Sequence, residues 1–197
     1  MMSYKVDPHL NRIEEVKPFP ARSSVGFEWK KIEARGIEGV NIYRGNPTRG
    51  RQSLKLIGTT KNRYTTHFVD SDVKPDSTYI YTFTTYALGK ESKHGSVLKV
   101  KTPPALKEVG FFTAYAIDRS AIKLLWSPHR HESIAGYVIQ RSVNGGPWRF
   151  VANIKGRLMV EYIDTFVRRG NSYRYRIYAK SFDKVLSKPR KTDTLAM

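Results

Sequence analysis

The sequence contains no cysteine, so it can form neither disulfides nor thiolate metal sites. No apolar run approaches the ~18 residues that a membrane-spanning helix requires. Residues Met1 to Tyr4 lack the basic and apolar regions of a signal peptide. No asparagine stands in an Asn-x-Ser/Thr glycosylation sequence, which argues against a glycosylated ectodomain. A secretion signal or a lipid-anchored cysteine would therefore have to lie in a segment that this chain has lost.

Motifs for catalysis are also absent. The five histidines are scattered, none stands in a nucleophile motif such as Gly-x-Ser-x-Gly, and phosphate-binding glycine loops are missing. His129, His131 and Glu132 could meet on one loop, but a metal site needs three or four ligands in fixed geometry, and the sequence favours a solvated loop. We expect no enzyme activity, no cofactor and no bound metal.

The charge balance is strongly positive, with 35 Lys and Arg against 17 Asp and Glu, a net charge of +18. The excess is spread along the chain: residues 1–104 carry 18 basic and 10 acidic residues, and residues 105–197 carry 17 and 7. A charge of this size indicates attraction to anionic partners and says little about the fold.

The residues that are plentiful favour β-structure. Twelve tyrosines stand in runs with valine and isoleucine, and alternation such as Val25, Phe27, Trp29 is typical of strands with one buried face. A turn at Pro75 leads to Tyr79, six residues after Val73, which is the pattern of a tyrosine corner. The pattern recurs at Val167 and Tyr173.

The second half of the chain repeats the first. Trp126 follows Trp29 by 97 residues, as Gly136 follows Gly39, and Asp164 follows Asp70 by 94 residues, as Tyr173 follows Tyr79. The two aspartates precede the same corner, where we expect them to bond turn backbone. Such a repeat predicts two copies of one domain, separated by a stiff spacer at Pro103 and Pro104.

Each copy resembles a fibronectin type III domain. The resemblance rests on a tryptophan in the second strand (Trp29, Trp126), a glycine opening the third, and the tyrosine corner (Tyr79, Tyr173), although Asp76 and Arg169 replace the usual glycine and proline of the corner. It implies an all-β fold of two tandem seven-stranded antiparallel sandwiches and no enzyme activity. The expected organisation is a leader (1–15), domain 1 (16–102), linker (103–104), domain 2 (105–192) and tail (193–197).

One strand suggests a binding surface. Tyr173, Tyr175 and Ile177 should face the core, so Arg174, Arg176 and Tyr178 should point outward. The neighbouring third strand should add Val138 and Gln140 to the same face. Arginine beside tyrosine can grip carboxylate, phosphate or sulfate groups, whereas exposed strand positions also carry charge simply to prevent edge pairing.

The resemblance leads us to expect an interaction or scaffold module of the bacterial cell envelope, periplasmic or lipid-anchored, with a protein or an anionic envelope component as partner. One alternative is a nucleic-acid-binding protein, which the charge would suit, but the chain has no recognised nucleic-acid motif. A second is an extracellular adhesion or receptor fragment. Membrane contact is expected only through a lost lipid anchor.

Overall fold

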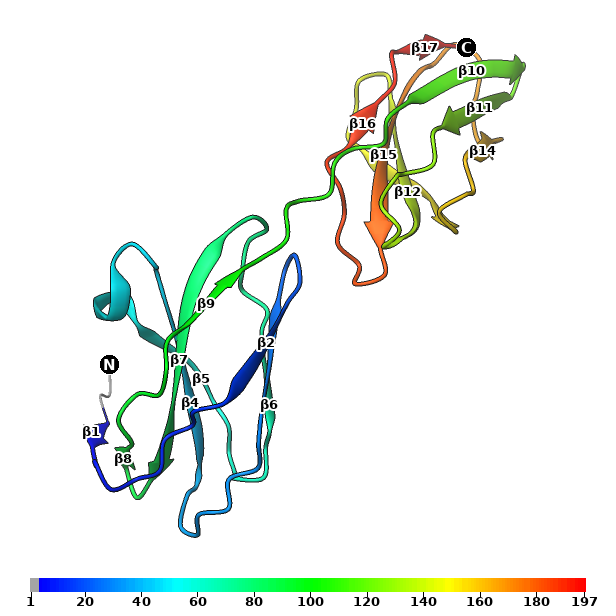
Figure 1. Ribbon diagram of the computed structural model, residues 1–197. Coiled ribbons are helices and arrows are strands. Elements are labelled where there is room, and N and C mark those ends of the chain that lie inside the picture. The colour runs from blue at the N-terminus through cyan, green and yellow to red at the C-terminus, as the bar shows by residue number, and fades with distance from the viewer. Residues whose placement is uncertain (1–3) are drawn as a thin grey trace. The chain divides into compact units, whose positions relative to one another are not determined.

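The computed structural model describes residues 4–197, which form two compact units divided after Ala105. Both are built from strands (Figure 1). No helix in residues 4–197 is long and apolar enough to cross a membrane. The expected fold class, all-β with two sandwiches in tandem, is confirmed.

The first unit pairs a three-stranded sheet, β2-β3-β6, with a larger sheet of order β1-β8-β7-β4-β5 in which β9 also pairs with β7. Its elements are β1 (Lys5–Val6), β2 (Val16–Pro20), β3 (Val25–Trp29), β4 (Gly39–Gly45), the 3-10 turn η1 (Gly50–Ser53), β5 (Lys55–Thr59), β6 (His67–Asp70), β7 (Thr78–Ala87), β8 (Lys90–Glu91) and β9 (Leu98–Lys101).

The second unit repeats this arrangement, with sheets β10-β11-β14 and β13-β12-β15-β16, the latter also pairing β17 with β15. Its strands are β10 (Phe112–Asp118), β11 (Ala121–Trp126), β12 (Ile134–Val143), β13 (Arg149–Lys155), β14 (Glu161–Asp164), β15 (Ser172–Ser181), β16 (Arg190–Lys191) and β17 (Leu195–Ala196). With β8 and β9, or β16 and β17, counted as one interrupted last strand, each unit has the strand order of a fibronectin type III sandwich.

Each core lies between the two sheets of its unit and is built by the alternation seen in the sequence. Trp29 and Trp126 are both 3% exposed, and the inward rings Tyr81 and Tyr175 are fully buried. Because side chains alternate across a strand, burying Tyr173, Tyr175 and Ile177 turns the residues between them outward. The core thereby decides which residues of β15 meet solvent.

Residues of the expected leader contact the first unit; residues 1–3 lie outside the described residues. Lys5–Val6 form β1, which pairs in parallel with β8 and so departs from an all-antiparallel sandwich. Ile13 is 8% exposed in the first core, and Asn11 accepts a hydrogen bond from Thr85. The segment follows no strand period because it binds by single apolar anchors and backbone contacts.

The expected tail and linker also belong to the units. β17 pairs with Ser172 and Tyr173, and Leu195 and Met197 pack against the second core. The Pro103 carbonyl accepts a hydrogen bond from the Asp76 amide at 2.9 Å. Backbone pairing thus incorporates segments that composition alone marks as connections.

Candidate binding surface

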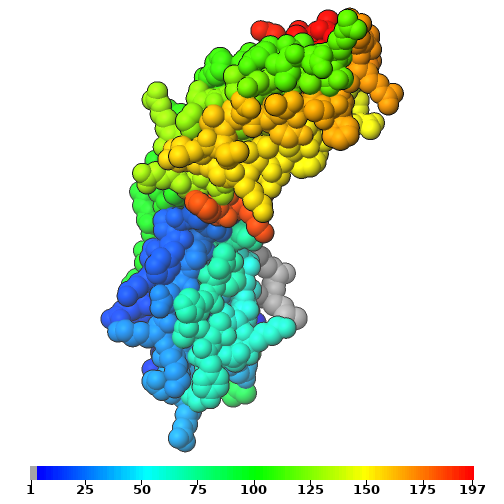
Figure 2. Space-filling model, turned by 90° about the vertical axis from the view of Figure 1, so that its right-hand side faces the viewer, coloured from blue at the N-terminus to red at the C-terminus, as the bar shows by residue number. Residues whose placement is uncertain are grey.

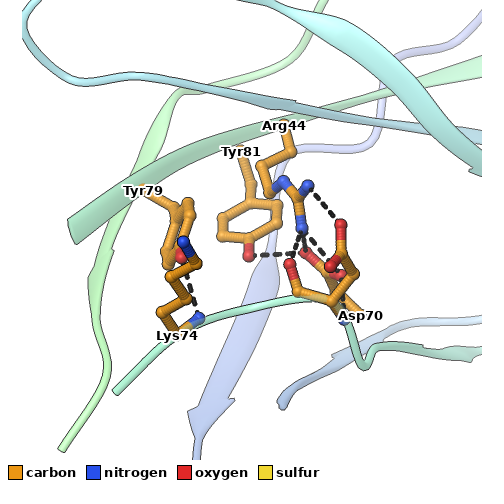
Figure 3. Close-up of polar contacts among 6 residues, drawn as sticks. Arg44, Asp70, Lys74, Tyr79 and Tyr81 are labelled. Atoms are coloured by element: carbon orange, nitrogen blue, oxygen red, sulfur yellow. Dashed lines mark hydrogen bonds and ion pairs between the residues drawn. The ribbon is translucent and has the colours of Figure 1, made fainter. Parts of the chain in front are cut away.

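The same buried network supports the larger sheet in both units. In the first unit, Arg44 on β4 donates to Asp70 on β6 at 2.9 Å, and the Tyr81 hydroxyl on β7 donates to the same carboxylate at 2.8 Å (Figure 3). In the second unit, Arg141 on β12 and Tyr175 on β15 donate to Asp164 on β14 at 2.7 and 2.8 Å. Each network joins the two sheets of its sandwich.

The two aspartates bond turn backbone as the sequence predicts, since Asp70 accepts from the Asp72 amide at 3.1 Å and Asp164 from the Phe166 amide at 3.0 Å. Their arginine and tyrosine partners were not foreseen, although both recur in the repeat. Burial, and then Asp164, raises the pKa of the Tyr175 hydroxyl, which therefore stays protonated as a donor.

The arginine of the second network also keeps its charge. Burial alone would lower the pKa of Arg141, but the hydrogen bond and charge of Asp164 outweigh it and raise that pKa. Asp70 and Asp164 are 5% and 0% exposed. These buried carboxylates link the two sheets of each sandwich and are not accessible to a ligand.

The tyrosine corners are present in both units. The Tyr79 hydroxyl accepts a hydrogen bond from the Lys74 amide at 2.9 Å (Figure 3). The Tyr173 hydroxyl accepts from the Arg168 amide at 2.6 Å and donates to the Arg168 carbonyl at 3.2 Å. Tyr173 is 3% exposed, whereas Tyr79 is only half-buried. The corner fixes where β7 begins in the first unit and where β15 begins in the second.

The structure brings the predicted surface residues together on the outward face of β12 and β15. Val138 lies opposite Tyr178 and Gln140 opposite Arg176 in the antiparallel register. Arg176 also lies opposite Lys191 of β16, and Gln140 lies opposite Phe150 of β13, whose ring is 64% exposed. We call this surface the cationic–aromatic face; it comprises Val138, Gln140, Trp148, Phe150, Arg174, Arg176, Tyr178, Lys180 and Lys191.

Arg176 is the best-held cation of this face. Its Nε donates to Gln140 Oε1 at 2.6 Å. Its guanidinium carbon lies 4.7 Å from the centre of the Trp148 ring and 5.4 Å from that of Tyr178. Contacts of this kind attract a cation to the aromatic ring and fix its orientation.

The neighbouring cations are positioned too. Arg174 is exposed and its Nε donates to the Thr192 carbonyl at 3.1 Å, and Lys191 Nζ lies 6.0 Å from the Trp148 ring centre. A shallow pocket beside the face is lined by Ser142, Trp148, Ser172, Arg174, Lys191 and Thr194, among others.

In the part of the chain that the structure describes, no carboxylate neutralises these cations. The ion pairs of the second unit join Lys123 to Glu161, Arg141 to Asp164 and Arg190 to Glu108. Within residues 4–197, Arg174, Arg176, Lys180 and Lys191 have no carboxylate oxygen within 4.0 Å. The face therefore presents ordered positive charge beside exposed aromatic surface, which suits an anionic ligand.

Sequence reasoning missed Trp148, Phe150 and Lys180 as members of the face. Trp148 follows the turn Asn144-Gly145, in which both residues have positive φ (51° and 74°). Such an Asn-Gly turn is a hairpin signal, and a hairpin would have placed the residues after it beside β12. Lys180 continues the outward alternation of β15, so extending that period would have found it.

The outward face of the three-stranded sheet β10-β11-β14 has a different character. Tyr115, Ile117 and Ile163 are 40%, 47% and 41% exposed there, and Lys123 is paired with Glu161 at 2.6 Å. Figure 2 shows this surface in green (β10 and β11) and gold (β14). It is apolar, and the charge of Lys123 is neutralised by Glu161.

Comparison with known proteins gives likeness to solved structures only. The chain matches the FN1–FN3 domains of chicken CNTN1 with 12% identity and a TM-score of 0.49, over 96% of this chain and 68% of that one. It matches a segment of two fibronectin type III domains from chicken tenascin with 14% identity and a TM-score of 0.44, over 95% of this chain and 100% of that one. No family model and no curated protein matches the sequence.

Proposed function

We propose that the chain is a non-enzymatic interaction module whose second unit binds an acidic protein partner through the cationic–aromatic face. The observation that carries the proposal is the set of cations held in place without a carboxylate partner. Three of them, Arg174, Arg176 and Lys191, are fixed by a backbone carbonyl, a glutamine and aromatic rings. A pre-positioned side chain loses less entropy on binding than a free one.

Positive charge spread over the whole surface would not give salt-resistant binding. Exposed charges far apart are screened beyond a Debye length of ~8 Å at physiological ionic strength, so a net charge of +18 yields weak binding that salt removes. A guanidinium that is already oriented can donate hydrogen bonds to both oxygens of one carboxylate. Binding through the face should therefore persist at salt concentrations that remove the diffuse attraction.

The test uses poly-L-glutamate as the acidic polypeptide and measures binding to the whole protein by isothermal titration calorimetry at low and at physiological salt. The double substitution Arg174→Ser, Arg176→Ser should weaken binding roughly tenfold or more at physiological salt, since each tenfold change corresponds to about 1.4 kcal/mol and one charge-assisted hydrogen bond to about 1.5–3 kcal/mol.

The matched control is Arg119→Ser, Arg130→Ser, which removes the same charge from exposed positions of the second unit outside the face. It should change the affinity less than about twofold, because rim charges contribute little. Equal losses in the two double variants would mean that only net charge matters and would refute the proposal.

We also propose the cell envelope as the setting, on the strength of the family resemblance alone. Fractionation of the source organism into cytoplasm, periplasm and membranes, followed by immunoblotting, tests it. Recovery in the periplasm or membranes supports the setting, and recovery in the cytoplasm refutes it without affecting the binding proposal.

A further inference from the structure

The outward residues of β15 form a stripe that contains both cationic and aromatic side chains. Arg174, Arg176, Tyr178 and Lys180 stand at alternate positions of one strand, each between inward residues that are buried. A strand rises ~3.4 Å per residue, so successive members of the stripe are about 6.8 Å apart along it. An extended polypeptide lying along the stripe would present its own alternate side chains at the same spacing.

The free edge of Arg176 has the geometry of a donor site for a carboxylate. Its Nε is engaged by Gln140, and rings of Trp148 and Tyr178 lie within 5.4 Å of the guanidinium carbon. Its two terminal nitrogens have no acceptor within residues 4–197. Two parallel N–H donors in one plane match the two oxygens of a planar carboxylate.

The stripe is interrupted by an apolar position. Tyr178 stands between Arg176 and Lys180, and the Val138 side chain lies opposite it on β12. A uniform polyanion would place charge over this tyrosine–valine pair and lose the hydration of that charge. A polypeptide can instead place an apolar side chain there and acidic side chains on either side.

We infer that the ligand of the cationic–aromatic face is an extended segment with acidic residues at alternate positions, followed in the same period by an apolar residue and a further acid. The inference rests on the proposed function and specifies its partner. The acids lie opposite Arg174 and Arg176, the apolar residue opposite Tyr178 and Val138, and the last acid opposite Lys180. The complementarity of charge and spacing selects this occupant.

The test compares two peptides of identical composition, the alternating GETETLTEG and the rearranged GEETTLETG, in which no two acids stand two residues apart; both are blocked at their ends. Binding to the whole protein is measured by calorimetry at physiological salt. The alternating peptide should bind roughly tenfold more tightly, because its acids reach both arginines at once. Arg176→Ser should abolish most of that difference, whereas Arg130→Ser should preserve it.

The outcomes separate this inference from the proposed function. Equal affinities for the two peptides, both lowered by Arg174→Ser, Arg176→Ser, would overturn the spacing while leaving the face as the binding surface. Absence of binding by both peptides and by poly-L-glutamate would overturn both. Heparin that binds more tightly than the alternating peptide, and loses that binding in the double variant, would identify a sulfated polysaccharide as the occupant and overturn the inference.

Discussion

The outward positions of the same strand differ completely between the two units. At the repeat offset of 94 residues, Arg174, Arg176, Tyr178 and Lys180 of β15 correspond to Ile80, Thr82, Thr84 and Tyr86 of β7. Ile80 is 6% exposed and Thr82 and Thr84 are fully buried, whereas Arg174 is exposed. A surface in one unit is thus part of the interior in the other.

In the first unit, this face is covered by polar groups from β8 and from the loop that follows it. The Glu91 carboxylate, 7% exposed, accepts hydrogen bonds from Tyr43 at 2.6 Å, Thr84 at 2.8 Å and Asn41 at 3.3 Å. Thr82 donates to the Gly95 carbonyl at 3.2 Å, and the His94 ring lies edge-on to Tyr43 at 4.8 Å. The hydrogen bonds to the Glu91 carboxylate and from the two threonines offset the cost of burying these groups.

The interior of the two sandwiches is nevertheless the same, since both keep the arginine–aspartate–tyrosine network and the tyrosine corner. The network and the corner therefore maintain the scaffold, while the outward face varies independently. One face is sealed by hydrogen bonds, and the other presents charged side chains to solvent.

The largest expected effect is loss of the shared network. Asp164→Ala leaves the half-buried Arg141 without its carboxylate and Tyr175 without its acceptor, and should destabilise the second unit by about 3–5 kcal/mol. Asp70→Ala should cost less, about 2–3 kcal/mol, because Arg44 keeps Asp72 at 3.0 Å. Urea denaturation of the whole chain, followed by the indole NMR signals of Trp29 and Trp126, reports each unit separately. Equal losses would show that Asp72 does not compensate.

Removal of the Glu91 carboxylate should affect only the first unit. Glu91→Ala leaves three donors in its buried cluster without their acceptor and should cost about 1–3 kcal/mol. The exposed acid Glu28 provides the control, and Glu28→Ala should change stability by less than about 0.5 kcal/mol. The Trp29 signal in the same denaturation experiment measures both. A Glu91→Ala protein as stable as the control would refute the role of the carboxylate in sealing this face.

The tyrosine corners should differ by a smaller amount. Tyr173→Phe removes a hydroxyl that both accepts and donates, at a cost of about 1 kcal/mol, while Tyr79→Phe removes a single acceptor on a half-buried ring and should cost somewhat less. Denaturant midpoints of the two variants measure the difference. A Tyr79→Phe loss larger than that of Tyr173→Phe would contradict this ranking.

The smallest expected effect is a pH dependence confined to the first unit. Burial lowers the pKa of His94 from its ordinary 6.5, partly opposed by the charge of Glu91. The folded state therefore disfavours the protonated ring, so stability is complete above about pH 6.5 and falls as the pH decreases from there toward the lower folded pKa. His94→Gln should reduce this loss in thermal unfolding followed through Trp29. A pH dependence unchanged by the substitution would assign it to other groups.

Patterns of consecutive residues were sufficient to predict the outward positions of β15 and the tyrosine corner. The alternation around Tyr173 placed Arg174, Arg176 and Tyr178 outward, and the spacing from Val73 to Tyr79 gave the corner, since both depend on a few consecutive residues. The burial of Thr82 and Thr84 could not be predicted, because it depends on Glu91 and Gly95 folding back over the strand. The contact of Arg176 with Trp148 likewise depends on where the β12–β13 hairpin places Trp148, which lies between its turn and β13.

The residues before β2 show the same limit. Ile13 has no periodic neighbours, and its burial is decided by contact with a core that residues far along the chain complete. Arg44 and Asp70 recur in the second copy as Arg141 and Asp164, but the sequence alone offered no reason to join the arginine and the aspartate in space.

The central claim is that the open face of the second unit binds acidic polypeptide and the sealed face of the first does not. The most direct test is a titration of the ¹⁵N-labelled whole protein with GETETLTEG, followed by amide chemical shifts at physiological salt. We predict saturable shifts along β12, β15 and β16, with the amides of β4 and β7 unmoved. Shifts of similar size in both units, rising without saturation, would show nonspecific charge attraction and contradict the claim.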